Sequence, residues 1–137
     1  MREMILAFAG SLSAGVLFNV KSKNLFWIGL SGMLGWMVFS WLNKATGGII
    51  IPTFLGAVAV GLFSESMARI IKSPATVFSV SGIFPLVPGI GAYTTVQLIV
   101  ENKLTEATSK AVETLASAAA IAMGIMLVFA VFRFVSK

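Results

Sequence analysis

The stretch TVFSVSGIFPLVPGIGAYTTVQ, residues Thr76 to Gln97, decides how the rest of this chain is interpreted. It is long and apolar enough to cross a bilayer, yet two prolines and three glycines lie within it. A proline removes a backbone donor, and its ring clashes with the preceding helical turn. Pro85 therefore leaves the carbonyl of Ser81 without a helical partner. Pro88 does the same to the carbonyl of Phe84, so the stretch predicts a broken transmembrane helix.

The break predicts unpaired amides as well as unpaired carbonyls. Pro88 suits the first position of a second helix, whose early N–H groups have no partner within the helix. These groups belong to Gly89, Ile90 and Gly91. Unpaired backbone at membrane depth persists only where it is buried in protein or lines a polar cavity. Two interpretations follow: a solute site near the midplane, as in transporters with broken helices, or a proline kink that serves packing alone.

Polar side chains flank the break on both sides. Ser79 and Ser81 precede it, and Gly89, Tyr93 and Gln97 recur at helical spacing after it. Tyr93 is the only tyrosine, and its hydroxyl suits either a bond across helices or a contact with a solute. The candidate substrate-binding residues are Ser79, Ser81, Phe84, Pro85, Pro88, Gly89, Ile90, Gly91, Tyr93, Thr94 and Gln97.

Composition places the chain in a membrane. Of its 137 residues, 58% are hydrophobic and 11% are charged, against roughly 45–50% and about 25% in soluble domains. We expect a single transmembrane domain over residues 1–137. The chain has no cysteine and no histidine, so we expect no disulfide, zinc site or other cofactor. The net charge of +5 comes from scattered basic residues rather than a patch, which argues against a nucleic-acid partner.

The hydropathy pattern predicts an all-α protein with about five transmembrane helices. They cover about residues 4–20, 25–42, 49–71, 76–100 and 115–134, the fourth being the broken one. The charged stretch from Glu101 to Glu113 predicts a solvated helical extension, with Thr105 as its N-cap and an ion pair between Glu106 and Lys110. Small residues four apart in several segments predict close helix packing and leave a homo-oligomer open.

Charge also predicts the orientation. Under five spans, four basic residues lie on the N-terminal side: Arg2, Lys44, Lys103 and Lys110. Six lie on the other side: Lys21, Lys23, Arg69, Lys72, Arg133 and Lys137. The positive-inside rule then places the N-terminus outside and the C-terminus in the cytoplasm, across the inner membrane. A re-entrant fourth segment would move the C-terminus outside. A single arginine precedes the first apolar stretch, and we expect no removed signal peptide.

Glu65 is the only carboxylate within a predicted span. Charged side chains inside a membrane cost about 2.5–3.5 kcal/mol on insertion scales and are functional candidates. One interpretation makes Glu65 a proton carrier, because burial raises the pKa of a carboxyl group towards the working range. The other pairs it with Arg69, one helical turn later and near the membrane edge. Glu65 and Arg69 are therefore the candidate proton-coupling residues.

Several short motifs resemble those of the threonine/serine exporter family. They are Ser64-Glu65, Ala68-Arg69, Lys72, Pro74 to Phe78, Ile83, Pro85 to Gly89 and Ala92-Tyr93, with Phe18 to Val20 also fitting. The likeness is densest from Gly56 to Thr95 and is closest to the small membrane component of the split, two-chain members. It implies proton-driven antiport that exports threonine and serine, with a larger membrane component as partner.

Other functions stay open at this stage. Some split relatives are associated with succinate or other small dicarboxylates, and a helix N-terminus would bind any carboxylate. The chain also suits a structural or assembly subunit that binds no solute. An enzyme is not expected, because the sequence has no histidine, cysteine, paired aspartates or HExxH motif.

Overall fold

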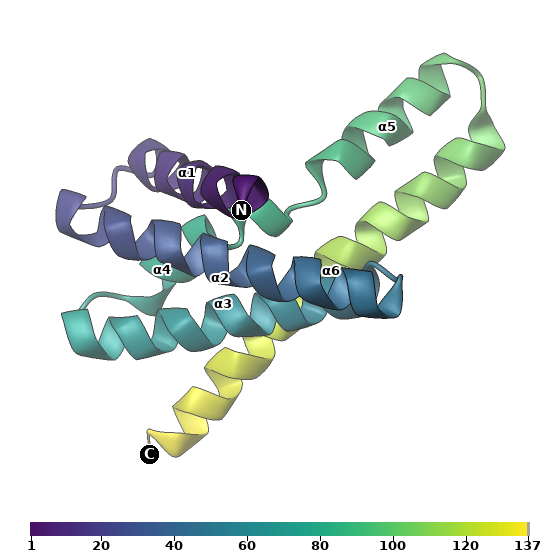
Figure 1. Ribbon diagram of the computed structural model, residues 1–137. Helices are drawn as coiled ribbons and strands as arrows, with labels where there is room; N and C mark the ends of the chain where they lie inside the picture. Colours follow the sequence, from purple (N-terminus) through teal and green to yellow (C-terminus); the bar gives the residue numbers. More distant parts are fainter. Residues whose placement is uncertain (137) are drawn as a thin grey trace.

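The computed structural model describes residues 1–136, and every regular element in that range is helical (Figure 1). The elements in chain order are α1 (Arg2–Leu17), α2 (Ser22–Thr46), α3 (Ile50–Ile71), α4 (Ala75–Gly82), the 3-10 helix η1 (Phe84–Leu86), α5 (Gly89–Val100) and α6 (Leu104–Val135). The predicted all-α fold with a broken fourth segment is confirmed.

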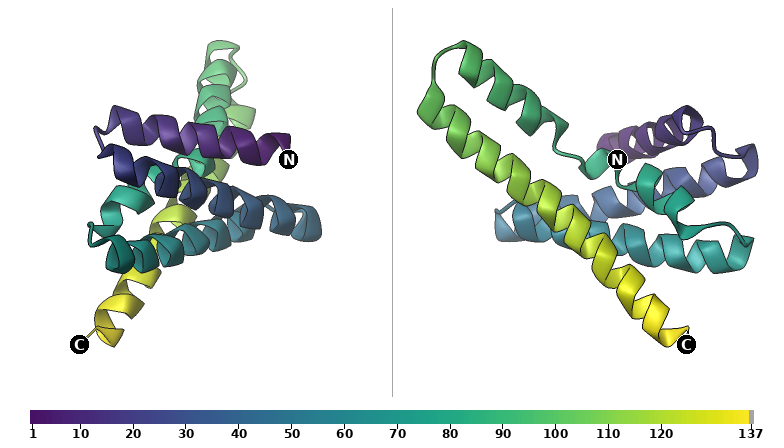
Figure 2. Two further views of the ribbon diagram at one scale, coloured as in Figure 1. Left: turned by 60° about the vertical axis from the view of Figure 1, so that its left-hand side comes forward. Right: turned by 180° about the vertical axis from the view of Figure 1, so that it is seen from behind.

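The helices form a bundle with a projecting arm (Figures 1 and 2). Helices α1 to α4 pack together, with α2 against α1, α3 and α4. Helix α5 and the first half of α6 form an antiparallel hairpin that extends away from this bundle. The second half of α6 crosses α3. A fork therefore opens where the arm leaves the bundle, and the broken segment lies at its base.

Three helices, α2, α3 and α6, are long and apolar enough to span a membrane. The bent pair of Ala75–Leu86 and Gly89–Val100, at 47° to each other, adds a fourth span if the pair crosses as one unit. Helix α1 has 16 residues, a length of about 24 Å against about 30 Å of hydrocarbon. The structure thus has three or four candidate spans where about five were expected, because α1 is too short to count as one.

Helix α1 ends earlier than the predicted residue 20 because the chain turns at Asn19. That residue has φ 59°, in the left-handed region that asparagine adopts more readily than most residues. The amide of Asn19 donates to the carbonyl of Val16, and the amide of Val20 donates to that of Gly15, both at 3.0 Å. This Schellman pattern satisfies the last carbonyls of the helix. Asn102 ends α5 in the same way, with φ 60°.

Small residues hold the long helices close together, as their spacing predicts. At the crossing of α3 and α6, a Cβ added to Gly124 would lie 2.8 Å from the carbonyl oxygen of Phe54. A Cβ on Gly61 would lie 3.1 Å from the Cβ of Val128. Between α2 and α3, a Cβ on Gly56 would lie 3.0 Å from a backbone oxygen of α2. These close contacts hold α2, α3 and α6 in position at the base of the fork.

The start of α6 differs from the sequence prediction. The helix begins at Leu104, with Lys103 and not Thr105 in the N-cap position. The left-handed turn at Asn102 ends α5, and the next helix starts directly after it. The helix therefore begins before Thr105, the residue expected to cap it. Lys110 pairs with Glu113 at 3.3 Å, and no ion pair joins it to Glu106 within residues 1–136. The predicted extension and last span form one continuous helix of 32 residues.

Candidate functional site

The break itself is a short 3-10 turn between two helices at an angle. Helix α4 ends at Gly82, η1 contains Pro85, and Val87 is extended before α5 begins at Gly89 with Pro88 as its N-cap. The predicted bare carbonyls are not bare. The carbonyl of Ser81 accepts a hydrogen bond from a backbone N–H at the C-terminal end of α4. The carbonyl of Phe84 accepts a hydrogen bond from the amide of Val87 at 3.3 Å. Tighter i to i+3 bonds therefore close this side of the break.

The amide side of the break stays partly open. The amide of Gly89 donates to the carbonyl of Val87 at 2.8 Å. The amides of Ile90 and Gly91 follow in the first turn of α5, where N–H groups have no partner four residues earlier within the helix. Two donors at the N-terminus of α5, where the helix dipole is positive, are thus available to an anionic group.

A cavity of about 320 Å³ lies beside the break, in the fork between the arm and the bundle. Helices α2 and α3, η1, α5 and α6 all contribute to its wall. Its lining residues are Trp36, Phe39, Ile49, Thr53, Pro85, Leu86, Val87, Pro88, Ile90, Gly91, Lys110, Glu113, Thr114 and Ser117. The volume is at the lower end of the range of about 300–1,000 Å³ that is typical of small-molecule sites.

The cavity contains one ion pair and several hydroxyl groups. The Nζ of Lys110 lies 3.3 Å from Oε1 of Glu113, and the two side chains are 32% and 42% exposed. Thr114 and Ser117 donate to the carbonyls one turn earlier in α6, so their hydroxyl oxygens remain as acceptors. The indole N–H of Trp36 is buried and has no partner among the described residues. The site thus offers a cation, an anion and neutral donors and acceptors.

A second charged region lies at the far end of α6 and does not reach the break. Glu65, Arg69 and Arg133 line a shallow groove there, together with Phe132 and Ser136. Arg69 donates to the carbonyl of Phe132 and to the hydroxyl of Ser136, and its guanidinium lies 4.8 Å over the Phe132 ring. The ion pairs within residues 1–136 do not include Glu65 with Arg69. The pairing predicted as the alternative role of Glu65 is therefore not formed.

Comparison with known protein families agrees with this architecture. The family described as threonine/serine exporter, ThrE, matches residues 3–131, which is nearly the whole chain. The chain belongs to the threonine/serine exporter family. It is a multi-pass membrane protein of long apolar helices and one bent pair. No solved structure matches the exporter chain.

Only part of the predicted substrate-binding set lines the exporter's cavity. Pro85, Pro88, Ile90 and Gly91 do so. The remaining seven lie elsewhere: Ser79, Ser81, Phe84, Gly89, Tyr93, Thr94 and Gln97. They are separated because the chain turns between α4, which faces the bundle, and α5, which faces away from it (Figure 1).

The residues outside the cavity have other surroundings in the exporter. Ser79 and Ser81 are buried within the bundle. Phe84 lines a neighbouring cavity of about 340 Å³ with Glu3. Tyr93 is 71% exposed. The amide of Gln97 donates to the carboxylate of Glu101 at 3.1 Å.

Sequence reasoning missed the polar wall of the exporter's cavity. Lys110, Glu113, Thr114 and Ser117 recur at i, i+3, i+4 and i+7, which places them on one face of α6. Lys110 and Glu113 belong to the stretch that was predicted to be solvated, because nothing local shows that the arm folds back over the break. Trp36 gave a further signal, since it lies away from the ends of α2 where anchoring tryptophans belong.

Within the described residues, no group of three or more His, Cys, Asp or Glu side chains is placed to hold an ion. The charged and hydroxyl-bearing side chains that line the cavity supply charge pairing and hydrogen bonding. Such a site suits recognition of a small polar solute.

Proposed function

We propose that this exporter carries threonine and serine as zwitterions and that the cavity beside the break is their binding site. The observation that supports this is the ion pair of Lys110 and Glu113 inside a small cavity with otherwise apolar and hydroxyl-bearing walls. An α-amino acid carries one positive and one negative group a short distance apart, which matches a site with one charge of each sign.

Each polar group of the cargo has a counterpart. The carboxylate meets Lys110 and the amides of Ile90 and Gly91 at the start of α5. The ammonium group meets Glu113. The side-chain hydroxyl meets Thr114 or the unpartnered indole N–H of Trp36. Binding replaces the ion pair between Lys110 and Glu113 with two ion pairs, one from each residue to the cargo. Both protein charges already lie in the cavity, so binding brings no further protein charge into it.

Dicarboxylates fit the same site less well. The first carboxylate of succinate would meet Lys110, but the second would face the carboxylate of Glu113. Arg69, which could have met a second carboxylate, lies beside the C-terminal end of α6 and does not line the cavity. Charge at the site therefore favours a zwitterion over a dianion.

We propose that Glu65 carries the coupled proton in antiport. It is a carboxylate within a candidate span, and Arg69 is engaged with the end of α6 rather than with it. No ion pair within residues 1–136 involves Glu65, and a carboxylate inside a membrane segment is a functional candidate by default.

We further propose a larger membrane component as partner. Helix α5 has no buried residue, and its exposed apolar side chains need either lipid or protein around them. The N-terminus is proposed to lie outside and the C-terminus in the cytoplasm. The basic residues of the α1–α2 and α3–α4 turns lie at the same end of the molecule as the C-terminal end of α6 (Figures 1 and 2). Lys137, which also counted towards this orientation, lies outside the described residues.

Transport into inverted membrane vesicles tests the proposed cargo. Vesicles containing this chain and its larger partner are given radiolabelled threonine, serine or succinate, with a proton gradient present or collapsed. We expect gradient-dependent accumulation of threonine and serine, competed by each other and not by succinate. Vesicles with either component alone serve as controls. Accumulation of succinate in place of the amino acids would overturn the assignment, and an intact complex that accumulates none of them would indicate an assembly subunit.

A further inference from the structure

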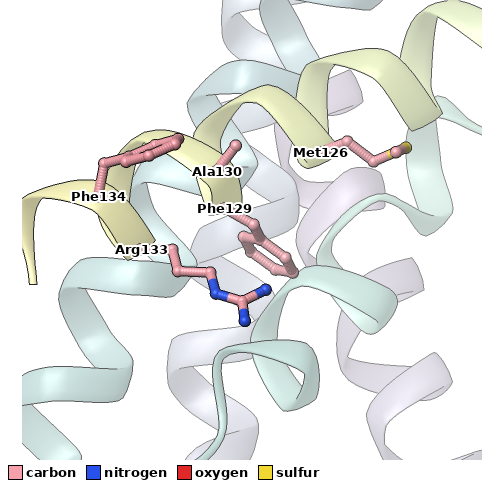
Figure 3. A pocket seen from close by; sticks show the side chains of 5 residues that line it. All are labelled: Met126, Phe129, Ala130, Arg133 and Phe134. Carbon is pink, nitrogen blue, oxygen red and sulfur yellow. The ribbon is translucent and has the colours of Figure 1, made fainter. Parts of the chain in front are cut away.

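The second half of α6 carries an apolar groove with one charged lining residue, Arg133. The groove has a volume of about 510 Å³ and is lined by Met126, Phe129, Ala130, Arg133 and Phe134 (Figure 3). All five residues come from α6, at spacings of three and four that place them along one side of the helix. Figure 3 shows Phe129 and Arg133 side by side, with Met126 further along the helix.

A second hollow meets this groove at Phe129 and Arg133, which line both. It brings in Arg69 from the end of α3. Arg69 is held in position by Ser136 and by the Phe132 ring beneath it. The guanidinium groups of two helices therefore border one hollow, and the apolar groove leads into it.

The charge of this hollow is positive. Arg69, Arg133 and Glu65 line it, which gives two cations and one carboxylate. The ion pairs found within residues 1–136 involve none of these three side chains. Glu65 thus neutralises neither guanidinium by direct contact.

We propose that this site binds an anionic phospholipid, with its phosphate between Arg69 and Arg133 and an acyl chain along Met126 and Phe129. Charge complementarity selects the phosphate, because guanidinium groups bind phosphate oxygens through paired hydrogen bonds. The apolar groove selects a lipid over free phosphate, because only a lipid supplies an acyl chain to fill it. Basic pockets between transmembrane helices are known to hold such headgroups. The proposal does not depend on the identity of the cargo.

The site is tested with the purified chain in nanodiscs of phosphatidylcholine, to which phosphatidylglycerol of the same acyl chains is added. Tm and native mass spectrometry report binding. We expect phosphatidylglycerol to raise the Tm and to remain bound in the gas phase. Arg133→Gln is expected to lose the Tm shift. It is also expected to bind phosphatidylglycerol about tenfold more weakly, because one charged hydrogen bond to the phosphate is lost. Arg133→Lys keeps the charge and is expected to retain part of the binding.

Lys44→Gln is the matched control, since it removes one exposed basic residue from the far end of α2 and is expected to bind phosphatidylglycerol as the wild type does. An equal response to phosphatidylcholine, or full binding by Arg133→Gln, would overturn the proposal. The same Tm shift with inorganic phosphate alone would show an anion site without a lipid groove, which also contradicts it. A photo-crosslinker at position 133 that captures a protein chain rather than lipid in the native membrane would assign the groove to a protein partner instead.

Discussion

Replacing Glu113 with glutamine removes one charge from the proposed site and keeps the shape of the side chain. If the ammonium group of threonine binds this carboxylate, the substitution deletes a charged hydrogen bond, which is worth about 1.5–3 kcal/mol when buried. The side chain of Glu113 is 42% exposed, and solvent screening reduces that figure to about 1–2 kcal/mol. Each 1.4 kcal/mol is a factor of ten, so we expect threonine affinity to fall about 5- to 30-fold.

Isothermal titration calorimetry of the purified complex measures this change directly. Glu106→Gln is the control, because it removes a carboxylate from the same helix without touching the cavity. The same substitution is expected to improve succinate binding, since it removes the carboxylate that faces the second acid group. Threonine affinity within twofold of the wild type, with no gain for succinate, would refute the proposed orientation of the cargo.

Three further outcomes are expected. Gly124→Ala lowers stability by about 1–3 kcal/mol, because its Cβ would lie 2.8 Å from a backbone oxygen of α3. Gly89→Ala, whose Cβ would have no atom of residues 1–136 within 4 Å, leaves the Tm unchanged, and equal Tm values for the two variants would refute this packing. Glu65→Gln abolishes the gradient dependence of vesicle transport but keeps threonine exchange, and gradient-driven transport at the wild-type rate would remove Glu65 from coupling. The hydrogen bond from Lys103, and after it that from Gln97, lowers the pKa of Glu101. The contact between Glu101 and Lys103 therefore stabilises the protein above the ordinary pKa of glutamate, and this stabilisation is lost as the pH falls through the lowered pKa of Glu101. NMR titration should show the pKa of Glu101 rising in Lys103→Gln.

The broken helix was predictable because its cause is local. Proline prevents the helical bond wherever it occurs, so Pro85 and Pro88 fix the position of the break without any tertiary information. The state of the freed carbonyls was not predictable in the same way. The 3-10 turn that satisfies Ser81 and Phe84 depends on how the chain bends after α4.

The position of the cavity depends on contacts between distant parts of the chain. Pro88 and Gly91 were predicted from the motif, but Lys110 and Glu113 enter the site only because the arm folds back across the fork. A charged stripe on a helix has the same sequence pattern whether it faces water or a cavity. Tyr93 is the opposite case: it was predicted to be in the site because it lies one helical turn after Gly89, but its side chain is exposed on the outer face of α5.

The spans and their packing were predicted with different success. The close-packed crossing of α3 and α6 follows from small residues at helical spacing, as at Gly61 and Gly124. The length of α1 does not follow from hydropathy, because its end is set by the left-handed turn at Asn19 and not by the apolar residues around it.

The most direct test of the cavity as the cargo site uses the absence of native cysteine. A single cysteine is introduced at Thr114, which lines the cavity, or at Tyr93, which is exposed on α5 outside it. The rate of labelling by a small thiol reagent is then measured in the assembled complex, with and without saturating threonine. We predict that threonine slows labelling of Thr114→Cys and leaves that of Tyr93→Cys unchanged. Protection of Tyr93→Cys with none at Thr114→Cys would contradict the account and move the binding site to the outer face of α5.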